Sequence, residues 1–165
     1  MTTISHARLA RFWQRSDKAQ TPTEKGKALE DLISYLFGKI PGFSLTTRNE
    51  NNIFHTEEID VAFWNDKHRQ GAYFLPYTIL VECKNWSHSV GSTEVGWFDT
   101  ILRNRGLTFG ILIAANGITG NAYDRTAAHS IIAAALREQR QIIIITRQEL
   151  ELTCQSHIQL GGLSP

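Results

Sequence analysis

The fold is decided by two segments, EEIDVAFW at residues 57–64 and YTILVECK at residues 77–84. Apolar residues alternate with other residues in both, which is typical of β-strands whose successive side chains point to opposite faces. One face carries the apolar set: Ile59, Val61 and Phe63 in the first segment, and Ile79, Val81 and Cys83 in the second. We therefore predict two strands that bury this face and place Asp60, Glu82 and Lys84 on an opposite, more polar face.

Outward from these strands, the pattern predicts further helices and strands. An amphipathic helix is expected at residues 4–15, and a second begins at the capping box Thr21-Pro22-Thr23-Glu24 and ends at Gly38. The remaining expected strands are 43–48, 109–114 and 141–146, and the remaining helices run from Ser92 or Thr93 to Arg105 and from Thr119 to about Arg137. A strand, a crossover helix and a strand in this order indicate a parallel pair. The predicted fold class is α/β, a mixed central sheet flanked by helices on both faces.

Length and composition favour one globular domain. The chain has 165 residues, a formal net charge of +1 and two cysteines, Cys83 and Cys154, far apart in sequence. Such a pair indicates neither a disulfide framework nor a zinc site. We expect a basic helix and linker at residues 1–20, a main domain at 21–153 and a tail at 154–165. No signal peptide and no apolar run of membrane-spanning length are visible, so a cytoplasmic protein is expected.

Asp60, Glu82 and Lys84 form a pattern that suits phosphodiester hydrolysis. Mg²⁺ prefers oxygen ligands and usually takes one or two carboxylates from a protein, which Asp60 and Glu82 would supply from adjacent strands. Lys84 follows Glu82 by two residues on the same strand face, where an ammonium group can stabilise charge on the attacked phosphate. The alternative is that the three residues are surface charges in a solvated ion pair.

An Asp followed by Glu-x-Lys on the next strand resembles the PD-(D/E)xK nuclease superfamily, and the resemblance runs from about Thr21 to Leu150. Within the superfamily the chain is most similar to Mrr-type restriction endonucleases, through Ile59-Asp60, Glu82-Cys83-Lys84 and Ile118-Thr119. Ile59 stands where the superfamily's name has proline. The resemblance implies a restriction-endonuclease-like core and a further acidic residue on an early helix, which matches Glu30. Holliday-junction resolvases share this core and remain an alternative.

These observations predict a deoxyribonuclease that uses Mg²⁺ or Mn²⁺. Asp60 and Glu82 are the expected metal ligands, Lys84 assists the attacking water, and the resemblance makes Glu30 an outer or second-metal ligand. A single site that cuts both strands of DNA suggests a homodimer, and a protein partner could supply specificity. The alternatives are a catalytically inactive nucleic-acid-binding or assembly subunit of the same fold, a nuclease that acts on RNA, and a branched-DNA resolvase.

The first helix carries a basic face. Arg8, Arg11 and Arg15 recur at helical spacing and are candidates for contacts with DNA phosphates. A solvated helix face is the alternative for these three arginines.

Overall fold

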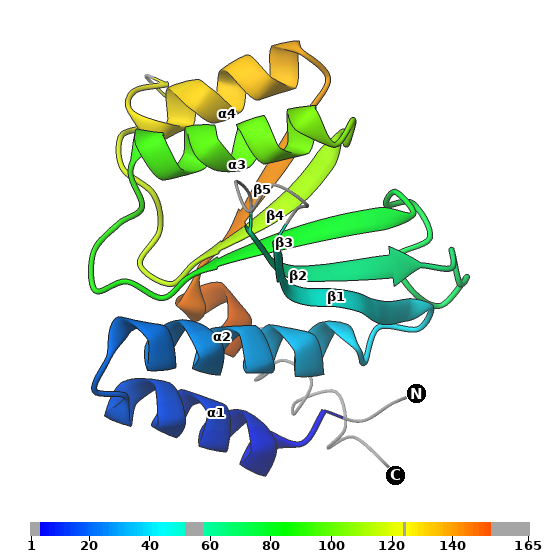
Figure 1. Cartoon of the computed structure of the whole chain (residues 1–165), viewed down its shortest axis with the longest axis vertical. Helices are drawn as coiled ribbons and strands as arrows, with labels where there is room; N and C mark the ends of the chain where they lie inside the picture. Colours follow the sequence, from blue (N-terminus) through cyan, green and yellow to red (C-terminus); the bar gives the residue numbers. More distant parts are fainter. Residues whose placement is uncertain (1–3, 52–57, 124, 153–165) are drawn as a thin grey trace, which may run out of the picture.

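A computed structural model describes residues 4–51, 58–123 and 125–152 (Figure 1). Its elements in chain order are α1 (His6–Lys18), α2 (Pro22–Phe37), β1 (Phe43–Asn51), β2 (Glu58–Asn65), β3 (Thr78–Lys84), α3 (Ser92–Asn104), β4 (Phe109–Ala114), α4 (Ala128–Arg137) and β5 (Gln141–Ile145). Residues 147–152 add a short helical segment after β5. None of the helices in the described part of the chain is long and apolar enough to span a lipid bilayer.

The strands form one mixed sheet in the order β1-β2-β3-β4-β5. β1, β2 and β3 are antiparallel neighbours, whereas β3, β4 and β5 run parallel to one another. The chain therefore makes a meander followed by two crossovers, which pass through α3 and α4. This arrangement confirms the predicted α/β class, with helices on both faces of a mixed sheet.

Helices cover the sheet on both sides, and each side has its own hydrophobic core. On one side α2 packs against β2 and β3, with α1 as an outer layer that contributes Leu9. On the other side α3 and α4 pack over residues such as Ala62, Leu80 and Leu112. The expectation of a polar face opposite the first core is therefore wrong, because Ala62 and Leu80 lie on that face and are buried.

The face alternation of β2 also breaks at its beginning. Val61 and Phe63 belong to the core under α2 as predicted, but Ile59 packs against the core under α3 and α4. The ladder between β2 and β3 ends at the pair Val61 and Val81, so the residues before Val61 are no longer held in register by β3. The site described below lies at this point.

α2 begins with the predicted capping box. The Thr21 side chain accepts a hydrogen bond from the Glu24 N–H at 3.2 Å, and the Glu24 carboxylate accepts one from the Thr21 N–H at 3.1 Å. Both contacts satisfy amide groups that a helix N-terminus leaves unpaired. The start of α2 is thereby fixed, which places Glu30 two turns into the helix and against the sheet.

The helix expected from Thr119 is shorter than predicted, since α4 begins at Ala128. Gly120 adopts a φ of +96°, and a Cβ added there would lie 2.3 Å from the Thr126 carbonyl oxygen. A left-handed residue in such close contact interrupts a helix, so the segment before Ala128 is a loop. The Thr119 carbonyl accepts a hydrogen bond from the Ala128 N–H at 3.2 Å instead of beginning the helix.

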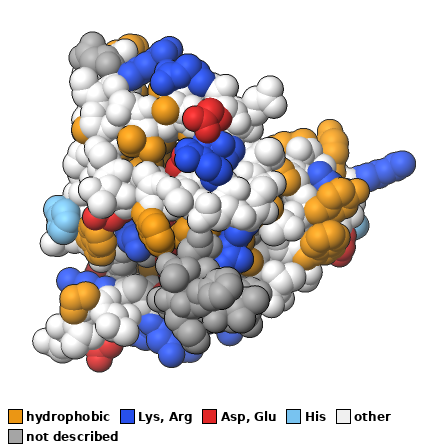
Figure 2. Space-filling view, turned by 45° about the horizontal axis from the view of Figure 1, so that its top comes forward, with side chains coloured by type: hydrophobic (Ala, Val, Ile, Leu, Met, Phe, Trp, Pro, Cys, Tyr) orange, Lys and Arg blue, Asp and Glu red, His pale blue; other side chains and the backbone are white. Residues whose placement is uncertain are grey.

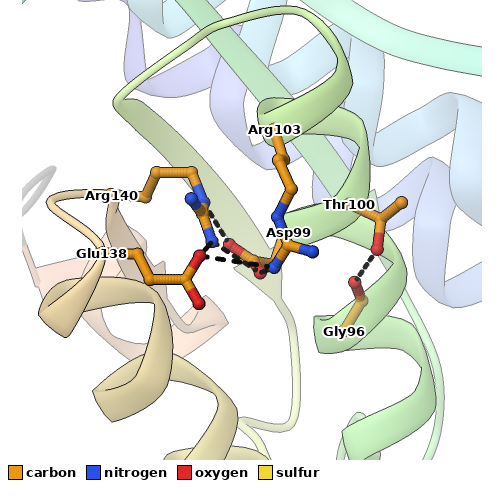
Figure 3. A network of polar contacts seen from close by, with 6 residues as sticks. All are labelled: Gly96, Asp99, Thr100, Arg103, Glu138 and Arg140. Atoms are coloured by element: carbon orange, nitrogen blue, oxygen red, sulfur yellow. Dashed lines mark hydrogen bonds and ion pairs between the residues drawn. The ribbon is translucent and has the colours of Figure 1, made fainter.

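An ion-pair network fastens α3 to the connection between α4 and β5 (Figure 3). Asp99 of α3 accepts hydrogen bonds from Arg140 at 2.8 and 3.2 Å, and both residues are buried. Arg103 and Glu138 flank the pair on its exposed side. This network lies where β5 begins, at the opposite end of the parallel strands from Glu82 and Lys84.

Candidate active site

The candidate site lies where β2 and β3 separate. Their last paired residues are Val61 and Val81, and the next residues along the two strands are Asp60 and Glu82. Beyond this point the Asp60 carboxylate accepts a hydrogen bond from the Cys83 N–H at 2.7 Å. The Asp60 side chain of β2 thus contacts the backbone of β3 just beyond the last paired residues. This contact holds Asp60 beside Glu82.

Glu82 and Lys84 form an ion pair within the same strand. The distance from Lys84 Nζ to Glu82 Oε1 is 2.7 Å, and the side chains are 25% and 10% exposed, respectively. Lys84 Nζ also lies 5.8 Å from the centroid of the Trp86 ring. Burial disfavours the ammonium charge, but the attraction of Glu82, followed by that of Asp60, outweighs it and raises the pKa of Lys84. The lysine is therefore cationic at neutral pH and is held at one place. The solvated surface ion pair considered from the sequence does not fit, because Glu82 is buried.

Asp60 is an unusual carboxyl group. Burial and the nearby charge of Glu82 together raise its pKa from 3.8 to about 7, and Glu30 adds to the effect. The Cys83 N–H and the charge of Lys84 oppose the shift without cancelling it. Negative charge is thus crowded in a poorly hydrated place, which a bound cation would relieve.

Glu30 approaches the site from α2. Its side chain is 12% exposed, and Arg48 Nη2 on β1 lies 3.5 Å from its Oε2 atom. This Oε2 atom is buried and makes no hydrogen bond within the described residues. Arg48 also pairs with Asp31, which in turn pairs with Arg15 of α1. A series of ion pairs therefore links α1 to the acidic residue beside Asp60.

Two residues at this site were missed from the sequence. Arg48 was placed in a predicted strand without a role, and no local pattern marks it as the partner of Glu30. Asn85 directly follows Lys84 and donates hydrogen bonds to Ser16 Oγ at 2.7 Å and to the Lys25 carbonyl at 2.9 Å. Asn85 thereby joins the end of β3 to the C-terminal end of α1 and the first turn of α2.

Cys83 lies inside the Glu-x-Lys pattern but faces the core under α2, as predicted from the alternation. Its side chain is buried, and burial, followed by the charges of Asp60 and Glu82, raises the pKa of its thiol well above the usual value. The thiolate is the reactive form of cysteine, so this residue is chemically inert in the folded protein.

Two of the three arginines of α1 make contacts within the chain. Arg8 lies over the Tyr35 ring, 4.8 Å from its centroid. Arg15 pairs with Asp31 and donates to the Lys27 carbonyl at 3.2 Å. Arg11 is exposed to solvent. Removal of Arg11 would therefore leave the contacts of Arg8 and Arg15 intact.

The donor set at the site fits a hard divalent cation. Among residues 4–51, 58–123 and 125–152, no three His, Cys, Asp or Glu side chains stand close enough to enclose a metal ion. Mg²⁺ does not need such a cage, because it commonly keeps several waters and takes one or two carboxylates from the protein. Asp60 and Glu82 supply two carboxylates, and their mutual repulsion is the feature that a cation would remove.

The structure thus combines a mixed sheet that has helices on both faces with a carboxylate pair beside a lysine, where two strands diverge. A family model described as restriction endonuclease matches residues 23–152, which include Glu30, Asp60, Glu82 and Lys84. The chain belongs to this family, the Mrr-type branch of the PD-(D/E)xK nucleases. A comparison with curated proteins returned no significant match.

Proposed function

We propose that the chain is a metal-dependent endonuclease that hydrolyses DNA phosphodiester bonds. The observation that carries the proposal is the meeting of Asp60 and Glu82 in one poorly hydrated place, beside the ammonium group of Lys84. The ionised form of Asp60 is disfavoured in such a place, and a bound cation would stabilise it. Membership of the restriction endonuclease family supports the same conclusion.

Each residue has a distinct role in this proposal. Asp60 and Glu82 hold Mg²⁺ or Mn²⁺, which when bound polarises the phosphate and lowers the pKa of water. Lys84 orients the attacking water and stabilises negative charge on the phosphate oxygens, because it remains protonated. Glu30 serves as an outer ligand, since its charge acts on Asp60 and its buried Oε2 atom lacks a hydrogen bond within the described residues.

The proposal is tested by cleavage of plasmid, linear, branched and single-stranded DNA, and of RNA, with Mg²⁺, with Mn²⁺ and with a chelator. We expect DNA cleavage that needs a divalent ion and is lost in Asp60→Ala and in Glu82→Ala. Glu138→Gln is a matched control, because it removes an exposed carboxylate at the far end of the parallel strands. Full activity in chelator, or in either folded alanine variant, would contradict the proposal.

The same panel separates the alternatives. A non-catalytic member of the fold would bind nucleic acid without cutting it, and a nuclease that acts on RNA would spare every DNA substrate. Preference for the branched substrate would indicate a junction resolvase. We further propose that the chain acts as a homodimer, because one site cuts one strand at a time, and that a protein partner supplies sequence specificity. Sedimentation analysis with and without duplex DNA tests the dimer.

A further inference from the structure

The connection between β2 and β3 is a fixed structure at the end of the sheet far from Asp60 and Glu82. Asn65 is fully buried there, and its amide lies within 3.2 Å of the carbonyl oxygens of Ala72, Leu75 and Pro76. Its own carbonyl accepts a hydrogen bond from the Lys67 N–H at 3.0 Å. Four backbone groups of the loop therefore converge on one buried side chain, which determines the shape of the loop.

The loop also packs closely against the turn that precedes β1. A Cβ added at Gly71 would lie 1.9 Å from the Pro41 carbonyl oxygen, so only glycine fits there. Gly42 in that turn has a φ of +84°, a conformation that glycine adopts without strain. These constraints mean that the loop presents its side chains in a defined arrangement.

The side chains presented in this way are large, aromatic and exposed. Tyr73, Phe74 and Tyr77 are 58%, 73% and 56% exposed, and Trp64 at the end of β2 is 42% exposed. Trp64 and Tyr77 stack with their ring centroids 5.3 Å apart. Figure 2 shows hydrophobic side chains gathered at the right of the molecule, beside Lys and Arg side chains, where Figure 1 places this connection.

Cations border the aromatic rings. Lys67 Nζ lies 4.7 Å from the centroid of the Tyr77 ring, and the side chains of Lys67, Arg69, Tyr73 and Tyr77 line a hollow of about 670 Å³. The loop contains one acidic residue, Asp66, whose carboxylate accepts a hydrogen bond from the Trp64 indole at 2.8 Å. The hollow therefore combines positive charge with open aromatic rings and no carboxylate in its lining.

We propose that this loop platform, composed of Trp64, Lys67, Arg69, Tyr73, Phe74 and Tyr77, binds an unpaired segment of the nucleic-acid substrate. Aromatic rings stack on bases only where the bases are not paired, and cations beside the rings contact the phosphates between them. The inference rests on the proposed function in taking nucleic acid as the substrate. It goes beyond that function by assigning a second binding surface and a substrate class, nucleic acid with a single-stranded portion.

The distance between platform and site sets the length of that portion. β3 runs from Thr78 beside the platform to Lys84 at the site, which is about 20 Å at about 3.3 Å per residue. An unpaired strand whose bases stack with the duplex rise of about 3.4 Å per nucleotide covers this distance with about six nucleotides. A shorter single-stranded end would not reach from the loop platform to the candidate active site.

Binding measurements on the full chain in chelator test the platform without any cleavage. Fluorescence anisotropy would compare labelled blunt duplex, single-stranded DNA, and duplexes with overhangs of roughly two and roughly twelve nucleotides, lengths that bracket the span estimated above. We expect the wild-type protein to bind the single strand and the long overhang more tightly than the blunt duplex. The combined variant Tyr73→Ala/Phe74→Ala should lose this preference, with affinity for the single strand falling by at least about fivefold.

Three further variants make the result specific. Arg69→Ala should weaken binding. It should also lower the slope of log K against log salt by the value for one phosphate contact with a single strand. Tyr73→Phe should retain the preference, because a phenyl ring also stacks. Tyr123→Ala removes an exposed tyrosine outside the platform, on the loop before α4, and should change nothing. Thermal unfolding should be unchanged in all of them, since these side chains are exposed.

The inference is overturned if the Tyr73→Ala/Phe74→Ala protein keeps the overhang preference, or if blunt duplex and single strand weaken equally. It is also overturned if wild-type protein prefers the blunt duplex. That result would favour a protein partner as the ligand of the platform. Failure of the proposed function gives a different result. In that case the platform still binds single strands in chelator, while no nucleic acid is cleaved when Mg²⁺ or Mn²⁺ is added.

Discussion

Asp60 is a residue in an unfavourable environment, and its protonation affects the stability of the whole domain. Its pKa is about 7 in the folded protein against 3.8 ordinarily, so between these two values the folded state binds more protons than the unfolded state. The free energy of unfolding of the metal-free protein therefore falls as pH rises from about 4 to about 7 on account of this group. Above about pH 7 the destabilisation is fully present.

We accordingly predict that Asp60→Asn stabilises the metal-free protein at pH 8. The amide keeps an acceptor for the Cys83 N–H but carries no charge. The gain should be about 1–2 kcal/mol, at about 1.4 kcal/mol per pKa unit and discounted for the water that reaches the group. Denaturant unfolding in chelator at pH 4 and pH 8 measures it. An equal effect at both pH values would show that Asp60 is not protonated in this range.

Our second prediction is that removal of the Lys84 side chain affects catalysis but not metal binding. An ammonium group cannot bind a cation, so Lys84→Ala should leave the affinity for Mg²⁺ unchanged or slightly raised. The single-turnover rate should fall by about 10²–10³-fold, as is typical when one positioned donor is removed. Lys84→Arg should restore little of it, because a planar guanidinium does not reproduce a compact ammonium.

Calorimetric titration of metal and single-turnover cleavage together check this prediction. Near-normal cleavage in folded Lys84→Ala would remove the lysine from the mechanism. Loss of metal binding in the same variant would mean that the ion pair between Lys84 and Glu82 holds the carboxylate in position.

The thiol of Cys83 gives a third prediction. In a Cys154→Ala background it is the only cysteine, and it should resist thiol reagents until the protein unfolds, because it is buried with a raised pKa. Cys83→Ser should retain activity, with a stability cost of about 1–2 kcal/mol for a hydroxyl group in an apolar core. Labelling at the same rate in native and unfolded protein would contradict the buried placement.

Among the elements, α3 depends on one buried pair for its attachment to the connection between α4 and β5. Asp99→Ala leaves the Arg140 guanidinium buried beside the exposed Glu138 alone. We predict a loss of about 2–3 kcal/mol in unfolding free energy, below the range for deeply buried pairs because the network borders solvent. Mg²⁺ affinity should not change, because the network lies at the opposite end of the parallel strands.

Arg103→Ala is the matched control for this prediction. It removes a 54% exposed side chain that contacts the same carboxylate, and it should cost less than about 1 kcal/mol. Similar losses in Asp99→Ala and Arg103→Ala would mean that the buried pair contributes no more than an exposed one.

Most elements were predictable because their signals are local. The capping box at Thr21 and the uninterrupted apolar run Phe109–Ala114 identify α2 and β4 within a residue. Gly120 misled the prediction, because an alanine-rich sequence favours a helix whereas the contact of Gly120 with Thr126 excludes one. The expectation of a polar sheet face was wrong even though helices were predicted on both faces. Ala62 and Leu80 on that face are buried beneath α3 and α4, so its charged residues occupy only the end near Glu82.

Some residues of the candidate site could be predicted from the sequence, and others could not. Strand alternation drew attention to Asp60, Glu82 and Lys84, and the family resemblance added Glu30. The alternation of β2 breaks at Ile59, however, so it did not predict how Asp60 is held. Arg48 and Asn85 depend on contacts between distant segments, which spacing along the chain does not encode. The raised pKa of Asp60 arises from its burial and from the charge of Glu82, both of which depend on how distant segments pack together.

For the whole molecule, DNA affinity should depend on salt through the basic residues of α1. Neutralising Arg8, Arg11 and Arg15 together should weaken binding, but the loss of the Arg15–Asp31 ion pair complicates that variant. Arg11→Gln alone is the clean test, and it should lower the slope of log K against log salt by about 0.9 if the residue contacts one phosphate. Arg137→Gln on α4 is the control. Equal slopes in wild type and both variants would mean that Arg11 is solvated and contacts no phosphate.

The first helix, α1, contacts the helical segment at residues 147–152. Arg147, in the helical segment after β5, donates to Asp17 of α1 at 2.6 Å and lies over the Trp13 ring, while Leu150 enters the same core as Leu9. During synthesis every strand can pair with the one made just before it, since the sheet order follows the chain. α2 can already pack on β2 and β3 once these strands have been made, with α1 on its outer side. The part of this core that Leu150 covers is completed only after β5 and the helical segment that follows it have been made.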